Sequence, residues 1–313
     1  GDTRVSHHWG YVAVLFSAFL FGIGTTINKM FLASVSPLFI ATVTELAGGF
    51  LLGCFSFLPR NTKLASSLNL PVRTKTVFVS RDLVLIIPMV LSGGVLAYWL
   101  YLLGLNNTTA VSAALLGNTE TLFTMGIAFV FLGERGRLKD YAATALLIIG
   151  GVILATNLNI VNQDAFGSLF GNLLVVAGCF FWGIDNNLSR LLSVKRSLLQ
   201  LGSIKAIIGG GLLLAITSLI GFQAAPSPVS IAYMAILGVF NVGLSLLLFL
   251  FALQEIGAMR TGVIFSTSSL FGAVSAFLIL REPISAVQIL AGLLMLFAIY
   301  ILSIPPRKNL GSV

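Results

Sequence analysis

The sequence predicts an all-α membrane protein in which ten transmembrane helices form two inverted five-helix repeats, arranged as a basket around a central cavity. Composition predicts the helices, because 57% of the 313 residues are hydrophobic and only 9% are charged. Soluble globular domains carry about 25% charged residues, and about 20 consecutive apolar residues cross a bilayer as one helix. A repeated pattern of segments, described below, predicts the two halves.

Polar breaks divide the apolar sequence into ten expected spans. In chain order these are residues 9–32, 37–58, 82–104, 108–132, 140–156, 167–192, 197–222, 228–253, 257–280 and 284–304. The first repeat covers residues 9–156 and contains one long cytoplasmic loop, residues 59–82. An external linker, residues 157–166, leads to the second repeat, residues 167–304. The tails, residues 1–8 and 305–313, are expected in the cytoplasm.

The positions of Lys and Arg predict the orientation. With ten spans, the termini and the breaks after even-numbered spans share one side. Of the 18 basic residues, 15 fall there, and the exceptions are Lys29, Lys205 and Arg281. Cytoplasmic segments are enriched in Lys and Arg, so both termini are expected in the cytoplasm of a cell whose plasma (inner) membrane holds the chain. The same distribution explains the net charge of +8 without nucleic acid.

Two pairs of segments reveal an internal repeat. "GYVAVLFSAFLFGIGTTINK", which ends at Lys29, aligns without a gap to "GNLLVVAGCFFWGIDNNLSR", which ends at Arg190. "FLGERGRLKDYAATALLIIGGVIL" aligns to "ILREPISAVQILAGLLMLFAIYIL", so that Glu134 pairs with Glu282. Five spans per half is an odd number, so the second half enters the membrane inverted. Inverted repeats allow alternating access to a site near the midplane.

These motifs resemble the EamA-type branch of the drug/metabolite transporter superfamily, over nearly the whole chain. The resemblance implies a ten-helix basket around a central cavity, which is lined largely by spans one, three, four, six, eight and nine. It also implies transport of small organic metabolites and is closest in character to the amino-acid exporters of that branch. The family has no universal catalytic motif, and the loop at residues 59–82 is longer than the family's usual turn.

Four ionisable residues fall inside the expected spans, where a charge costs about 2.5–3.5 kcal/mol at a helix centre. Glu120 is central, and its repeat partner is Ser268. It either faces the cavity and binds a substrate amine or a coupling proton, or it joins helices through hydrogen bonds. Glu45 is expected to pair with Lys29 or Arg281, or to extend its side chain toward water. Asp185 and Lys205 are expected to form an ion pair that helps to close an inner gate.

Other polar and aromatic residues on the expected lining helices complete the predicted site. Tyr98, Trp99 and Trp182 offer rings that stack on an organic substrate or cation. Asn186 either contacts the substrate or caps a helix locally. Glu134 and Glu282 each start the fifth span of a half, where a carboxylate satisfies free amides. Both are interpreted as structural, and a gating role of Arg281 with Glu282 is the alternative.

The predicted function is secondary transport, or facilitated diffusion, of a small organic metabolite. Amino acids are the favoured substrates and export is the favoured direction. The alternative within this class is proton-coupled efflux of drugs or lipophilic cations through Glu120 and Glu45. An intramembrane enzyme lacks zinc and nucleophile-elbow motifs, and a channel lacks a repeated filter sequence. The sequence indicates no cofactor, metal or nucleic-acid partner, and the chain is expected to act as a monomer in the lipid bilayer.

Overall fold

In a computed structural model of the chain, all the regular secondary structure of the described residues is helical. The described residues are 3–56, 80–131, 138–156, 163–193, 196–221 and 226–304. Within them, nine helical stretches are long and apolar enough to cross a membrane, and a shorter apolar helix, Ala286–Leu302, follows. The predicted all-α membrane class is therefore confirmed. Glu134 and most of the predicted loop at residues 59–82 lie outside the described residues.

The helices of the first half follow the expected spans, with interruptions that the sequence did not predict. They are α1 (Thr3–Leu32), α2 (Pro37–Ser56), α4 (Ser80–Met89), the π-helix η1 (Val90–Ala97), α5 (Tyr98–Asn106), α6 (Ala110–Leu116), α7 (Thr119–Phe131) and α8 (Leu138–Thr156). The third span thus contains a π-helical segment, and the fourth is broken into α6 and α7.

The second half has the same kinds of interruption. Its elements are α9 (Gln163–Ser193), α10 (Leu198–Ile220), α11 (Pro228–Gly238), η2 (Val239–Leu244), α12 (Ser245–Ile256), α13 (Ala258–Phe265), α14 (Ser268–Ser275), η3 (Ala276–Leu280) and α15 (Ala286–Ser303). The offset that pairs Glu134 with Glu282 places Val90 on Gly238 and Asn118 on Ser266. It therefore relates η1 to η2, and the break in the fourth span to the break in the ninth.

Local chemistry sets several helix ends. Ser285 and Gln288 form a capping box at the start of α15, which satisfies backbone amides that have no partner within the helix. Thr109 caps α6 by accepting a hydrogen bond from the amide of Ser112. Gly257 ends α12 at a φ of 83°, a conformation that costs glycine little because it lacks a Cβ.

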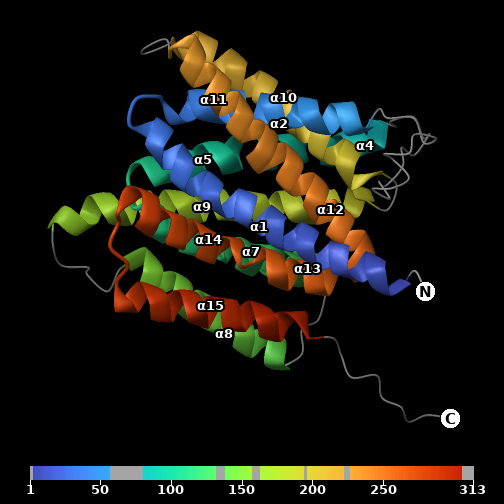
Figure 1. The fold of residues 1–313 in the computed structure, drawn as a ribbon, viewed down its shortest axis with the longest axis vertical. Helices are drawn as coiled ribbons and strands as arrows, with labels where there is room; N and C mark the ends of the chain where they lie inside the picture. The colour runs from blue at the N-terminus through green and yellow to red at the C-terminus, as the bar shows by residue number, and fades with distance from the viewer. Residues whose placement is uncertain are drawn as a thin grey trace.

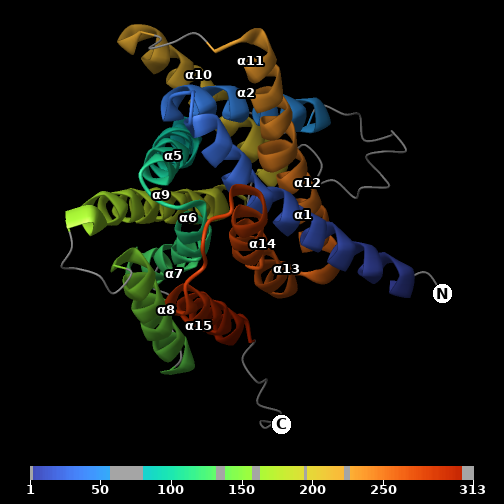
Figure 2. The ribbon, with the colours of Figure 1, turned by 60° about the vertical axis from the view of Figure 1, so that its left-hand side comes forward.

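The helices pack in pairs that repeat between the halves. The closest pairs are α2 with α10, α8 with α15, α1 with α12 and α14, and α9 with α5 and α7. Figures 1 and 2 show α2 and α10 at one end of the molecule, α8 and α15 at the other, and the remaining helices between them. If each span is replaced by the span five places later or earlier in the chain, the same set of pairs results. The pair of α1 with α12, for example, becomes the pair of α9 with α5.

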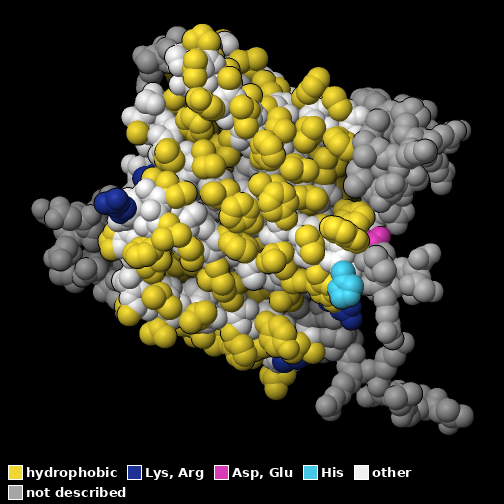
Figure 3. All heavy atoms as spheres, viewed as in Figure 1, with side chains coloured by type: hydrophobic (Ala, Val, Ile, Leu, Met, Phe, Trp, Pro, Cys, Tyr) yellow, Lys and Arg dark blue, Asp and Glu magenta, His cyan; other side chains and the backbone are white. Residues whose placement is uncertain are grey.

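The two sides of the bundle are distinguishable in Figure 1. Helix α1 begins and α15 ends on one side, whereas the turn between α1 and α2 lies on the opposite side, as does the connection from η3 to α15. We call the side that holds residues 33–36 and 107–109 the turn side. Between the two sides, hydrophobic side chains cover the face in Figure 3, and Lys and Arg lie at its edges. Such an apolar surface suits contact with lipid.

Candidate functional site

Two broken helices meet near the centre of the bundle. In the fourth span α6 ends at Leu116 and α7 begins at Thr119, and in the ninth α13 ends at Phe265 and α14 begins at Ser268. The side-chain amide of Asn118 donates a hydrogen bond to the hydroxyl of Ser269, at 3.1 Å. This contact joins the two breaks. Irregular backbone at membrane depth occurs where protein buries it or where it lines a cavity.

A cavity of about 270 Å³ lies beside these breaks. Its wall comes from α1, α5, α6, α7, α9, α12, α13 and α14, which belong to the six spans that the resemblance implies. Polar side chains line part of it: Thr25, Asn118, Thr121, Thr124, Asn186, Ser266, Ser268 and Ser269. Aromatic rings line the rest: Phe21, Tyr101, Trp182, Phe249 and Phe265. Glu120 is the one charged residue among those described in this wall.

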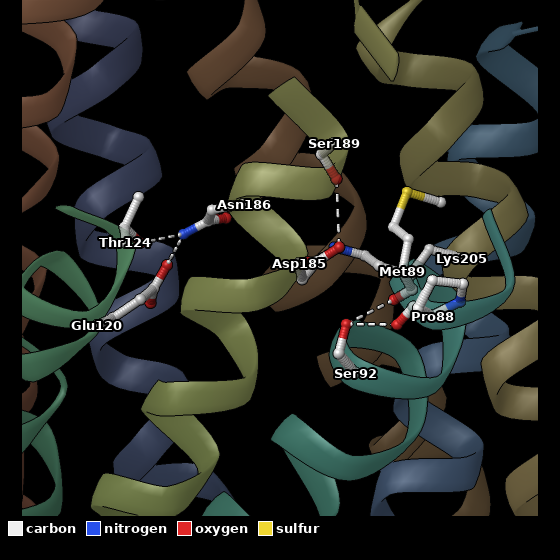
Figure 4. Close-up of polar contacts among 9 residues, drawn as sticks. All are labelled: Pro88, Met89, Ser92, Glu120, Thr124, Asp185, Asn186, Ser189 and Lys205. Atoms are coloured by element: carbon white, nitrogen blue, oxygen red, sulfur yellow. Dashed lines mark hydrogen bonds and ion pairs between the residues drawn. The ribbon is translucent and has the colours of Figure 1, made fainter. Parts of the chain in front are cut away.

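Glu120 is held by a partner on the neighbouring helix. Its Oε1 atom accepts a hydrogen bond of 2.7 Å from Nδ2 of Asn186 on α9. The same Nδ2 donates to the hydroxyl of Thr124, one turn after Glu120 on α7, at 3.1 Å, as Figure 4 shows. These hydrogen bonds orient the Glu120 side chain against α9. Of the two sequence alternatives, the structure thus places Glu120 both in a cavity wall and in a helix–helix contact.

The predicted aromatic residues separate into three places. Trp182 lines the cavity, and its ring centroid lies 5.2 Å from that of Tyr101. Tyr98 packs behind Trp182, at 6.3 Å between centroids, and accepts a hydrogen bond from Asn28. Trp99 does not line this cavity. Successive residues of a helix point about 100° apart, so Tyr98 and Tyr101 share a face that excludes Trp99.

A second cavity, of about 480 Å³, contains Trp99. It lies between the turn that joins α1 to α2 and the ends of α5 and α10. No charged residue occurs among the described residues that line it. Although it is larger, this cavity offers a solute no ionic anchor, so the smaller cavity beside Glu120 is the better candidate site.

The opposite face of α9 carries an ion pair. Asp185 precedes Asn186 in the chain but points toward α10, as Figure 4 shows, and its Oδ2 lies 2.6 Å from Nζ of Lys205. The expected contact between these residues is therefore present. The Asp185 side chain is only 3% exposed. The π-helix η1 makes room for it, because a Cβ on Gly93 would collide with its carboxylate.

Of the partners expected for Glu45, Lys29 is bound elsewhere. The ammonium of Lys29 donates to the carbonyl oxygens of Leu105 and Thr108, at 2.7 and 2.6 Å, so the predicted pairing of Glu45 with Lys29 is wrong. The Glu45 side chain is buried.

Helix α2, which carries Glu45, packs closely against α10, which carries Lys205. A Cβ on Gly49 would lie 2.8 Å from that of Ala206, and a Cβ on Gly210 would lie 2.8 Å from Leu46. Glycine at these positions lets the two helix backbones approach. Of the four ionisable residues that the sequence places in the membrane, the structure pairs Asp185 with Lys205 and places Glu120 in the cavity wall.

Glu282 binds a helix other than the one expected. Its two carboxylate oxygens accept hydrogen bonds from the backbone amides of Ala110 and Val111, at 3.0 and 2.9 Å. These are the first amides of α6, whereas Ser285 and Gln288 cap the helix that follows Glu282. The predicted cap at the start of its own span is therefore wrong.

Sequence reasoning missed part of the wall. Asn118 and Ser269 join the two broken helices, and Thr25 binds Tyr101 through their hydroxyls at 2.9 Å. A signal for the breaks is present in the runs "GNTET" and "STSS", in which small polar residues interrupt apolar spans. Such residues satisfy freed backbone groups in interrupted transmembrane helices. Among the described residues, no group of three His, Cys, Asp or Glu side chains is placed to hold a metal ion.

Known proteins match the chain over most of its length. The EamA-like transporter family model matches residues 8–156 and 169–304. An uncharacterized transporter of Methanothermobacter thermautotrophicus is 34% identical over 294 residues, which are 94% of this chain and 86% of that protein. An uncharacterized transporter of Archaeoglobus fulgidus is 24% identical over 216 residues, 68% of this chain and 73% of that protein. A protein of known crystal structure shares the fold, with a TM-score of 0.60 at 16% identity, over 96% of this chain and 98% of that one.

Proposed function

Since this chain belongs to the EamA-like transporter family, we propose that it is a secondary transporter or facilitator that exports small organic metabolites, amino acids above all. The observation that carries the proposal is the cavity where six spans meet, with Glu120 fixed in its wall by Asn186. A carboxylate so placed binds the ammonium group of a solute, and the rings of Trp182 and Tyr101 add cation–π attraction. Hydroxyl and amide groups in the same wall bind the remaining polar atoms.

Alternating access of two inverted repeats is the proposed mechanism. Three observations support it: the two ranges that match the family, the corresponding positions of η1 and η2, and the set of helix pairs that survives exchange of the halves. Five spans in each half would invert the second relative to the first. We further propose that the N-terminus and the end of α15 face the cytoplasm, because most Lys and Arg residues belong to that side, and that the membrane is the plasma membrane.

Organic cations are the second candidate substrates, and the wall of the cavity favours them. It holds a carboxylate, and the described residues supply it with no Lys, Arg or His to bind the carboxylate of an amino acid. Export of such cations would be coupled to protons that compete for Glu120 and Glu45. The two candidates differ in an observable way, because only the second requires release of protons when the solute binds.

Counterflow in proteoliposomes tests the proposal. Vesicles that contain the purified protein are loaded with one unlabelled solute, and uptake of the labelled solute is measured across a panel of amino acids, aliphatic amines and aromatic cations. We expect saturable counterflow for at least one class, with amino acids first. A panel without any counterflow would contradict the proposed transport. Efflux from preloaded cells, faster with the protein than without it, tests the direction.

Replacing Glu120 by Gln tests whether the Glu120 carboxylate binds the solute. Loss of a charge-assisted bond should raise the half-saturating solute concentration about tenfold or more. Glu255→Gln at the end of α12 is the matched control, because it removes the same charge outside the cavity wall. Equal half-saturation for Glu120→Gln and the unmodified protein would show that Glu120 does not bind the solute.

A further inference from the structure

We propose that Lys29 and Glu282 form a gate that closes the Glu120 cavity at the turn side of the bundle. The gate rests on the proposed function, since only a cavity that opens to each side in turn requires one. Its parts come from α1 and from the segment that follows η3, and both act on the turn between α5 and α6.

The two charged side chains form hydrogen bonds with the backbone on either side of this turn. The ammonium of Lys29 donates to the carbonyl of Leu105, in the last turn of α5, and to that of Thr108, in the connection to α6. The carboxylate of Glu282 accepts from the amides of Ala110 and Val111, at the N-terminal end of α6. A cation at the C-terminal end of a helix and an anion at the N-terminal end both interact favourably with the helix dipole. The positive charge of Lys29 therefore suits the end of α5, and the negative charge of Glu282 suits the start of α6.

These contacts lie one helical turn beyond the cavity wall. On α5, Leu105 follows the lining residue Tyr101 by four positions, and on α6, Ala110 precedes the lining residue Ala114 by four. On α1, Lys29 likewise follows the lining residue Thr25 by four positions. Four residues of α-helix correspond to about 6 Å along the axis. The turn between α5 and α6 therefore lies between the cavity and the turn side of the bundle.

The surroundings of these charges suit a contact that breaks and reforms. Lys29 and Glu282 are half-buried, so water can solvate both when the turn is released. Asp185, by contrast, is almost completely buried, and separating it from Lys205 would strand a charge in the membrane interior. The turn itself stays tied to α9, because the Thr108 hydroxyl donates to Oδ1 of Asn172 at 2.6 Å. Opening therefore moves α1 and the end of the ninth span away from the turn.

Labelling of a cavity thiol tests the gate without any substrate. Ser268→Cys places a reporter in the wall, in a background in which Cys54 and Cys179 are replaced by Ala. A membrane-impermeant maleimide is added to right-side-out or inside-out vesicles. Asn107 is exposed in the turn between α5 and α6. Labelling of Asn107→Cys therefore identifies the vesicle preparation in which the reagent reaches the turn side. The labelling rate from that side is the measurement.

We expect the reporter to react slowly from the turn side in the background protein. It should react about tenfold faster, or more, after Lys29→Gln, and faster still after Lys29→Gln with Glu282→Gln, because charged hydrogen bonds to the turn are lost. Lys29→Arg should keep the slow rate because it retains the charge. Arg281→Gln is the matched control, since Arg281 precedes Glu282 and is exposed.

Two results would overturn the gate. One is slow labelling from the turn side in Lys29→Gln, in protein that remains monodisperse. The other is acceleration by Arg281→Gln equal to that by Lys29→Gln. Because the assay uses no solute, a panel without counterflow would leave the labelling result intact, so failure of the gate and failure of the proposed transport can be told apart.

Discussion

The ion pair between Asp185 and Lys205 gives the sharpest prediction about stability. Replacing Lys205 by Met would leave the carboxylate of Asp185, whose side chain is 3% exposed, without its cation. Breaking a buried pair in this way costs about 3–5 kcal/mol. Asp185→Asn should cost less, about 1–3 kcal/mol, because the Lys205 side chain is 25% exposed and can extend its ammonium toward water. The neutral double variant should recover most of the loss.

Thermal unfolding in detergent measures these differences. For a chain of this size about 1 kcal/mol shifts Tm by about 2 °C. We therefore expect Lys205→Met to lower Tm by about 6–10 °C and Asp185→Asn to lower it by about 2–6 °C. The double variant should lie within a few degrees of the unmodified protein. A charge swap is a poorer test, because the tight contact of Gly93 with the Asp185 carboxylate leaves no room for a lysine at position 185.

Additive losses would refute this reasoning. If the double variant lost as much stability as the two single variants together, the charges would not depend on each other. The expected coupling energy between the two changes is about 2 kcal/mol or more, which exceeds the scatter seen for independent sites.

Two further predictions concern helix packing. Gly210→Ala should lower Tm, because the new Cβ would lie 2.8 Å from Leu46. Gly211→Ala should leave Tm unchanged or raise it, because its Cβ would meet no atom within 4 Å. Equal Tm values for the two variants would contradict close contact between α2 and α10. Asn241→Leu should lower Tm by about 2–4 °C, because its buried amide donates to two backbone carbonyls of α1. An unchanged Tm would show that these hydrogen bonds contribute little.

The sequence predicted the spans well because their physical cause is local. A backbone in lipid must satisfy its own amides and carbonyls, so an apolar run long enough to cross the bilayer becomes a helix. The interruptions at Gly117 and Ser266 escaped prediction because a tight turn in such a run depends on partners elsewhere. The side chain of Asn118, for example, binds Ser269 on another span.

The candidate site was predicted in part. Glu120, Trp182, Asn186 and Ser268 line one cavity, as a charge or polar group on a lining span led us to expect. Trp99 lines a different cavity, because assigning a residue to a lining helix does not settle its face, which changes by about 100° with each position.

By itself, then, the amino-acid sequence determined that this chain is a helical membrane protein, where its helices run, and which few charges the membrane interior must accommodate. Only the tertiary structure decided which groups meet: Glu120 with Asn186, Lys29 with the end of α5, and Glu282 with the start of α6. The physical reason is range. Apolar length acts along a single segment, whereas hydrogen bonds and ion pairs form within about 3–4 Å, a distance set by how each helix is rotated and packed.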